Sequence, residues 1–268
     1  MLATSREQTQ CVLANTRSQW GEDLMLLPYL LRAAGWRPGV FVELGAFDGI
    51  SLSNTHALEV CYNWTGVLIE GNPENYAALS RSRRRATKVH SAICDTTAAA
   101  GTVNMTVGGK NMAAQIDAMS QVQRDRIWGR GREYNSVRVP CKPLGRLMQA
   151  AGTDAAHLLS LDVEGAEERV LKTVDPACFA VVLVELDGTD KARDERIHTM
   201  LTAAGLQFQR QLALKQSGVY LRPKRLGTSA SCEEIAPCRC GALFHRGGRA
   251  AKHPRGAGGG LLRARKSF

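Results

Sequence analysis

The amino-acid sequence predicts an α/β protein with a doubly wound, mostly parallel sheet and one antiparallel terminal strand. Short apolar runs alternate with segments of helical spacing along residues 18–223, as expected of strands joined by crossover helices. Runs such as 180–186 are apolar at nearly every position, which is typical of strands covered on both faces. Only three residues separate the last two predicted strands. A parallel crossover needs a dozen or more, so one of these strands runs antiparallel.

The first half of this pattern contains three helices and three strands. Leucines return to one side of the segment 18–36, which indicates a helix. The β-branched and aromatic run at 40–44 ends in a glycine turn, and the run at 65–70 ends on a carboxylate and is followed by Pro73, a residue favoured in the first turn of a helix. These signals predict helices at 18–36, 51–62 and 74–85, and strands at 40–44, 65–70 and 88–93.

The pattern is least regular at residues 96–140 and resumes after them. Within this segment the clearest features are a hairpin-like stretch at 101–107 and an amphipathic segment at 113–128. The later alternation predicts helices at 144–151, 164–174 and 194–204, and strands at 157–161, 180–186, 206–214 and 218–222.

The formal charge of +10 is distributed unevenly along the chain. Residues 1–223 carry 25 basic and 23 acidic side chains, whereas residues 224–268 carry 10 and 2. The last segment is also rich in glycine and poor in large apolar residues, which is typical of disordered chain. We expect an N-terminal extension at 1–17, a folded domain at 18–223, and a disordered basic tail at 224–268 that contacts anionic surfaces weakly. The nearly neutral domain argues against specific nucleic-acid binding.

The sequence also bears on the compartment. It shows neither an apolar run long enough to span a bilayer nor a secretory leader. Its eight cysteines lack a disulfide-framework spacing, which predicts reduced thiols and a cytoplasmic protein. The Asn-x-Thr sequons at Asn63 and Asn104 carry little weight in such a protein. A zinc site in the tail is disfavoured, because Cys232, Cys238 and Cys240 form no Cys-x2-Cys pair.

The predicted binding site lies beyond the carboxyl ends of the first two strands, where open parallel sheets bind ligands. Gly45 allows a ligand close to the backbone, and the turn after it presents free N–H groups. A dinucleotide site needs a glycine at the position of Phe47, so NAD and FAD are disfavoured. Glu70 follows Gly45 at about the spacing of a carboxylate that binds ribose hydroxyls. Together these features favour a nucleoside cofactor such as S-adenosylmethionine.

Five blocks of sequence, in chain order, carry a family resemblance. They are SQWGED (18–23), FVELGAFDGISLSNTHALE (41–59), WTGVLIEGNPENYAAL (64–79), LLSLDVEGAEERVL (158–171) and VVLVEL (181–186). They resemble the FkbM-type S-adenosylmethionine-dependent methyltransferases, whose fold is Rossmann-like and of the class I methyltransferase type. The resemblance covers Ser18 to Arg222. The residues near Asn54 and Trp64 are also similar to the Star-like subgroup, which includes a trafficking factor not known as an enzyme.

The resemblance implies a cofactor site and a set of catalytic candidates. The implied contacts to the methionine and ribose moieties are Glu43, Gly45, Ala46, Asp48 and Gly49, with Asn54 and Thr55 on the following helix. The implied contacts to the ribose hydroxyls and adenine are Glu70, Asn72, Ser91, Ala92 and Asp95. The catalytic candidates are the strand-end carboxylates Asp162, Glu164 and Glu185. No pattern identifies residues 96–140, where acceptor specificity is expected.

Methyl transfer from a sulfonium is an in-line displacement, so alignment supplies much of the catalysis and a carboxylate is needed to take the proton of a hydroxyl acceptor. We expect O-methylation of a small molecule, a glycan or a lipid headgroup, with Asp162 nearest the reaction. Glu164 has a simpler explanation at the start of a helix, where a negative charge is favoured. The three carboxylates could instead hold a divalent cation, although nothing in the sequence requires a metal.

Two other functions compete with this interpretation. One is a non-catalytic, Star-like module in secretory traffic, which the retention of Glu43, Gly45, Glu70 and Asp162 disfavours. The other is nucleic-acid methylation, for which the sequence offers no aromatic stacking motif. Binding of S-adenosylmethionine separates the enzyme from the non-catalytic module.

Overall fold

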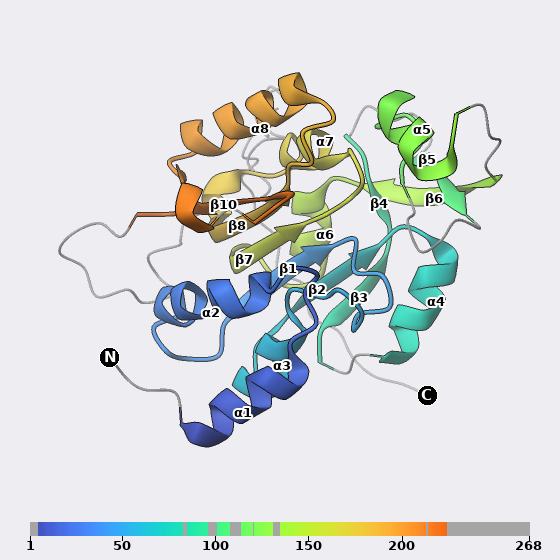
Figure 1. Cartoon of the computed structure of the whole chain (residues 1–268). Helices are drawn as coiled ribbons and strands as arrows, with labels where there is room; N and C mark the ends of the chain where they lie inside the picture. Colours follow the sequence, from blue (N-terminus) through green and yellow to red (C-terminus); the bar gives the residue numbers. More distant parts are fainter. Residues whose placement is uncertain are drawn as a thin grey trace, which may run out of the picture.

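The computed structural model describes residues 5–82, 85–95, 101–107, 114–119, 121–130, 135–212 and 214–223. The predicted tail at 224–268 lies outside the described residues. A seven-stranded sheet forms the centre of the domain, in the order β3-β2-β1-β7-β8-β10-β9 (Figure 1). Its strands are β1 (Val40–Leu44), β2 (Thr65–Glu70), β3 (Thr87–His90), β7 (Ala156–Leu161), β8 (Phe179–Glu185), β9 (Gln207–Phe208) and β10 (Ser217–Leu221).

The strand directions confirm the predicted fold class. The strands β3, β2, β1, β7 and β8 are parallel, whereas β10 pairs antiparallel with both β8 and β9. The chain builds outward from β1 to β3 and then returns to place β7 on the other side of β1, with Phe41 opposite Leu158 and Leu44 opposite Leu161. The order of the strands therefore reverses between β1 and β7, which is where sheets of this kind bind ligands.

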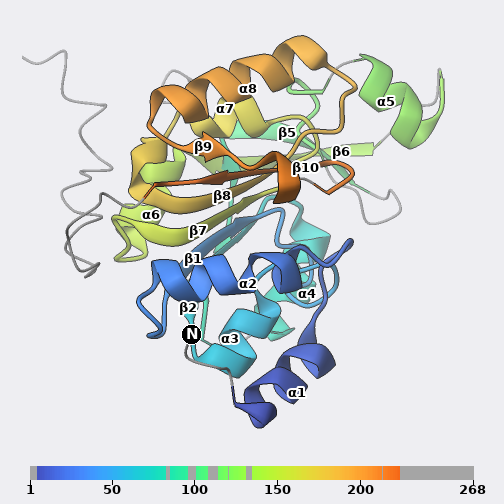
Figure 2. The same cartoon turned by 60° about the vertical axis from the view of Figure 1, so that its left-hand side comes forward.

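Helices cover both faces of this sheet. In Figures 1 and 2, α7 and α8 lie on one side of it, and α2 and α3 lie on the other. The helices of the described chain are α1 (Arg6–Asn15), α2 (Glu22–Ala33), α3 (His56–Tyr62), α4 (Pro73–Ser82), α5 (Gln121–Trp128), α6 (Leu144–Ala150), α7 (Glu167–Leu171) and α8 (Lys191–Ala203). No helix in this part of the chain is both long and apolar enough to cross a bilayer.

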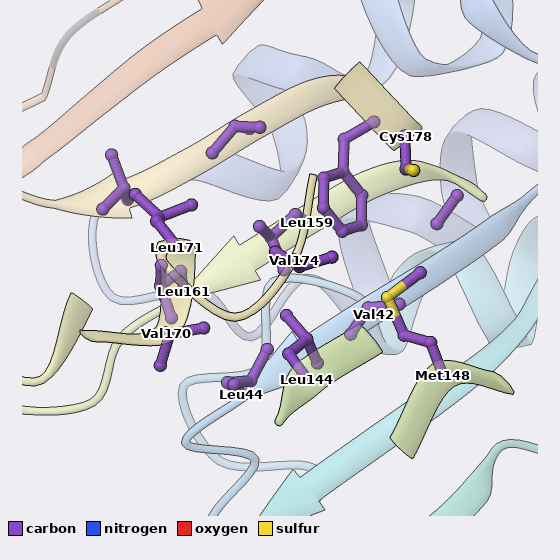
Figure 3. Close-up of a cluster of buried hydrophobic side chains, with 14 of the residues drawn as sticks. Val42, Leu44, Leu144, Met148, Leu159, Leu161, Val170, Leu171, Val174 and Cys178 are labelled. Carbon is purple, nitrogen blue, oxygen red and sulfur yellow. The ribbon is translucent and has the colours of Figure 1, made fainter. Parts of the chain in front are cut away.

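Alternating residues of the central strands supply two cores. Along β1, Phe41 packs with the α2 and α3 side, whereas Val42 and Leu44 face α6, α7 and α8. Figure 3 shows the core on the α6, α7 and α8 side, in which Val42 and Leu44 lie close to Leu144 and Val170. Both faces of the strand are thus buried, as its nearly continuous apolar sequence predicts. This packing fixes the strand ends that form the site.

A second, three-stranded sheet lies beside the first, in the order β4-β6-β5. Its strands are β4 (Ala92–Ile93), β5 (Thr102–Val107) and β6 (Asn135–Lys142). The predicted strand at 88–93 is therefore divided at Ser91, because its last residues leave β3 and pair with β6. The stretch at 101–107, predicted to be hairpin-like, is instead the single strand β5, and the sequence analysis missed its antiparallel partner β6.

Several predicted element boundaries need correction. The helix expected from residue 51 begins at His56, and the helix expected from Glu164 begins at Glu167. Both turns contain residues with positive φ, 61° at Leu52 and 54° at Glu164, so the chain cannot be helical there. The strand expected at 206–214 consists of Gln207–Phe208 followed by a turn of 3-10 helix.

Two disulfides overturn the expectation of reduced thiols. Cys11 of α1 is bonded to Cys61 of α3, and Cys94 after β4 is bonded to Cys141 of β6. The partners are 50 and 47 residues apart, so no local spacing indicates the pairing. Each bond closes a loop long enough to stabilise the fold by about 4 kcal/mol in the chain-entropy model. The prediction of a cytoplasmic location depended on reduced thiols and loses that support.

Candidate functional site

A cleft of about 440 Å³ opens beyond the carboxyl ends of β1, β2, β7 and β8, at the point where the strand order reverses. It contains most of the residues that the sequence analysis selected. The predicted residues that line it are Glu43, Gly45, Ala46, Asn54, Glu70, Ser91, Ala92, Asp162, Glu164 and Glu185. Elements far apart in sequence converge here because parallel strands end at the same edge of their sheet.

Gly45 brings the first turn against the end of β7. Its φ is +72°, and a Cβ atom placed on it would lie 1.8 Å from the backbone oxygen of Asp162. No side chain fits at that distance, so only glycine allows β1 and β7 to end side by side. The two strand ends thereby lie side by side at the floor of the cleft.

Glu70 joins the turns that follow β1 and β2. Its carboxylate accepts hydrogen bonds from the backbone N–H groups of Phe47, at 2.8 Å, and Asn72, at 2.7 Å. The side chain is buried, and burial raises its pKa to about 7 even though these N–H donors favour the charged form. Glu70 thereby holds two loops in place at the wall of the cleft.

Glu43 organises the segment between β1 and α3. Its carboxylate accepts hydrogen bonds from the hydroxyls of Ser53 (2.9 Å) and Thr55 (2.5 Å) and from the backbone N–H of Asn54 (2.9 Å). These bonds hold residues 53–55 outside the helix and present the Asn54 side chain to the cleft. The Asn54 amide donates to the hydroxyl of Ser160 at 3.0 Å, and its Oδ1 is buried without a hydrogen-bond partner. A donor group of a ligand can satisfy a buried acceptor of this kind.

Asp162 and Glu185 form a hydrogen-bonded carboxyl pair at the ends of β7 and β8. Asp162 faces the open cleft, and Glu185 lies partly buried beside it. Burial and the charge of Asp162 together raise the pKa of Glu185 far above its usual range. The pKa of Asp162 is also raised, because the walls of the cleft restrict its contact with water and other carboxylates lie nearby. The two carboxyl groups therefore share a proton.

The turn between Asp162 and α7 depends on a residue that the sequence analysis did not select. Glu167 is fully buried, and its Oε1 accepts the backbone N–H groups of Val163 and Gly165, both at 3.1 Å. Its Oε2 lies 3.5 Å from the guanidinium of Arg193. Glu164, in contrast, sits in the turn with φ +54° and lines the cleft, so the helix-start role expected for Glu164 is performed by Glu167.

Five of the predicted residues do not line the cleft. Asp48 accepts the N–H groups of Ile50 and Ser51 and so shapes the first turn, and Gly49 lies within that turn. Thr55 binds Glu43 as described above. Asn72 caps α4 by accepting the N–H groups of Glu74 and Asn75.

Asp95, the fifth, lines a separate cavity of about 470 Å³, together with Asp117 and Arg169. The cleft is also lined by Met105 and Gln115, which the sequence analysis did not select. Met105 lies in β5 and forms an antiparallel β-bridge with Gln115, and only the alternation of β5 could have indicated Met105.

The cleft is strongly acidic. Six carboxyl groups line it, from Glu43, Glu70, Asp162, Glu164, Glu185 and Asp187, and none of the described residues that line it is Lys, Arg or His. A cationic ligand is favoured in such a site, and a phosphate is disfavoured. This balance agrees with the absence of a glycine at Phe47.

The pKa of Glu70 predicts that the free energy of unfolding decreases as the pH rises. A glutamate titrates near 4.5 when unfolded and Glu70 titrates near 7 when folded, so the folded state binds more protons between these values. This contribution is fully present below pH 4.5 and is lost as the pH rises through about 7, with a slope of up to about 1.4 kcal/mol per pH unit. Urea unfolding of the wild type and Glu70→Gln across this range measures it. An equal slope in both proteins would contradict the assignment.

Comparisons with known proteins identify the family. The model of the methyltransferase FkbM domain matches residues 43–208. No curated protein matches the chain. Among solved structures, methyltransferase FkbM from Methylobacillus flagellatus is 12% identical, with 80% of this chain and 58% of that chain covered and a TM-score of 0.42.

Two further structures are similarly distant. The TDP-rhamnose 3'-O-methyltransferase of calicheamicin biosynthesis is 12% identical, with 82% and 88% of the two chains covered and a TM-score of 0.40. The O-methyltransferase from Bacillus cereus is 11% identical, with 82% and 92% covered and a TM-score of 0.38. The family model spans more than half of the chain, so the protein belongs to the FkbM family of S-adenosylmethionine-dependent methyltransferases, as the resemblance of its sequence implied.

Proposed function

We propose that this protein methylates a hydroxyl group of a small molecule, a glycan or a lipid headgroup. The observation that carries the proposal is the Asp162–Glu185 carboxyl pair, whose Asp162 faces the cleft that we assign to the cofactor. At the end of the cofactor site, the hydroxyl that receives the methyl group thus meets Asp162, which can take its proton.

The residues of the cleft fit S-adenosylmethionine, which carries an ammonium and a sulfonium charge. Glu70 offers carboxylate oxygens at the position expected for ribose hydroxyls, and Ser91 and Ala92 line the wall beside it. Asn54 Oδ1 is an acceptor that still needs a donor, and an ammonium group would supply one. The acidic lining favours both positive charges. When bound, the cofactor supplies an electrophilic methyl group.

Asp162 then serves as the general base. Its raised pKa makes the carboxylate a stronger base than an ordinary aspartate, and its open face leaves room for a hydroxyl. Glu185 orients Asp162 through the shared proton, and Glu164 adds negative charge at the rim. Gly45 and Glu167 hold the two turns that position these groups.

Calorimetric titration of S-adenosylmethionine into the full chain tests the cofactor site. We expect micromolar binding, and weaker binding of S-adenosylhomocysteine, which lacks the sulfonium charge that the acidic lining favours. Binding of neither compound would contradict the proposal and favour the non-catalytic, Star-like alternative.

The same titration tests the domain boundaries. We propose that residues 18–223 are the catalytic domain and that 224–268 is dispensable for cofactor binding. A chain that ends at Pro223 is expected to fold and to bind the cofactor with unchanged affinity. The extension at 1–17 must be kept in this experiment, because Cys11 is bonded to Cys61 and the backbone oxygen of Asn15 lies 3.1 Å from Nδ1 of His56. Loss of folding on truncation would place the boundary further along the chain.

A further inference from the structure

We propose that this chain folds in an oxidising, glycosylating compartment and carries N-linked glycans on Asn63 and Asn104. The inference is independent of the methyltransferase activity, because it depends on no residue that we place in the cleft. It starts from the two disulfides, which are rare in proteins of reducing compartments.

Each disulfide joins two parts of the chain that also pack against each other, α1 with α3 and the end of β4 with β6. Cys11–Cys61 ties the exposed helix α1 to α3, and Cys94–Cys141 ties the end of β4 to β6 in the small sheet. Cys178 is buried in the main core. Cys94 and Cys141 are buried in the core of the small sheet, and Cys11 and Cys61 are half-buried. Two disulfides in one domain are expected of a chain that matures in an oxidising environment.

Both Asn-x-Thr sequons present their asparagine to solvent. Asn63 ends α3 in the left-handed conformation, with φ +58°, and the residues on either side, Trp64 and Tyr62, turn inward. Asn104 lies on the exposed face of β5, between Val103 and the buried Met105. A glycan on either side chain would extend into solvent without displacing the core.

Each sequon also lies close to a disulfide. Asn63 follows Cys61 by two residues, and Asn104 lies on the strand that pairs with β6, which holds Cys141. The side chain of Asn63 contacts the guanidinium of the exposed Arg85, a surface contact that a glycan can replace. Neither asparagine lines the acidic cleft, so glycans at these positions leave the cleft open.

The test uses the full chain purified from the cells that produce it, with free thiols blocked at lysis. Treatment with peptide-N-glycosidase converts a glycosylated asparagine to aspartate, which peptide mass spectrometry detects at Asn63 and Asn104. Asn135 is the internal control: it is exposed on β6, the strand that pairs with β5, but is followed by Ser-Val, so it stays unmodified. Peptides joined through Cys11–Cys61 and Cys94–Cys141 are expected in the unreduced digest.

The proposal has a clear opposite outcome. Unmodified asparagine at both sequons overturns it, whatever the state of the cysteines, and so do blocked thiols at all four paired positions. Conversion at one sequon, together with both disulfides, supports folding in an oxidising, glycosylating compartment and limits the glycan to that asparagine. Methyltransferase activity is measured separately on the deglycosylated protein, so failure of this proposal is distinguishable from failure of the proposed function.

Discussion

Replacing Gly45 with alanine is expected to destabilise the protein more than the same change at Gly188, which has the same φ. The new Cβ would lie 1.8 Å from the backbone oxygen of Asp162, so β1 and β7 must separate at their carboxyl ends. The left-handed backbone costs about 1 kcal/mol for alanine, and relief of the overlap adds about 1–3 kcal/mol. Because the movement opens the floor of the cleft, cofactor affinity falls as well.

Gly188→Ala is the matched control for this change. Gly188 has the same φ of +72°, but nothing lies within 4 Å of a Cβ placed there. Its substitution therefore carries the backbone cost alone, and the difference between the two variants isolates the contact with Asp162. Urea unfolding and calorimetric binding measure the two effects. Equal stability in the two variants would show that the strand ends do not approach as closely as this structure describes.

The importance of Gly45 could be predicted from sequence because it depends on chain order alone. A glycine turn after the first strand and a carboxylate at the end of the second must meet at one edge of a parallel sheet. The same reasoning placed Asp162 and Glu185 at that edge, and both line the cleft. The sequence does not show why a glycine is needed there. The backbone of Asp162, which follows β7 and is more than a hundred residues away, leaves no room for a Cβ atom.

The two misplaced helix starts depend on buried carboxylates that accept hydrogen bonds from the turns before the helices. Glu43 holds Ser53 and Thr55 out of the helix that their spacing predicts. Glu167, not Glu164, binds the turn after β7, because backbone strain at 164 delays the helix. Local propensity cannot foresee either event, since each is decided by a buried carboxylate on another element or turn.

The second sheet and the disulfides show the same limit. The strand β6 alternates Val137, Val139 and Cys141, a pattern that was readable but was interrupted by Pro140. Pro140 pairs with Thr102 at the start of β5, and the next two residues of β6 pair with β4. Once β6 is in place, Cys141 meets Cys94, a pairing that neither spacing nor composition could have indicated.

The second large expected effect concerns the carboxyl pair of Asp162 and Glu185. In Asp162→Asn the acceptor hydroxyl loses its base, so turnover should fall by about 10²–10⁴-fold, the range for removal of a general base. Cofactor affinity should fall far less, because Glu43, Asn54 and Glu70 remain. Turnover is measured as release of S-adenosylhomocysteine in the presence of hydroxyl acceptors chosen by screening. Unchanged turnover on such an acceptor would remove Asp162 from the reaction.

Two variants of Glu185 test how the pair shares its proton. If Glu185 is protonated and donates to Asp162, the amide of Glu185→Gln replaces that donor, and most of the activity is kept. Glu185→Ala removes the donor, so the pKa of Asp162 should rise further and the acid limb of the kcat/KM profile should move to higher pH. Activity in Glu185→Gln as low as in Asp162→Asn would mean that Glu185 acts as a charged group. The pair would then have to bind a cation together, and the base would be another residue.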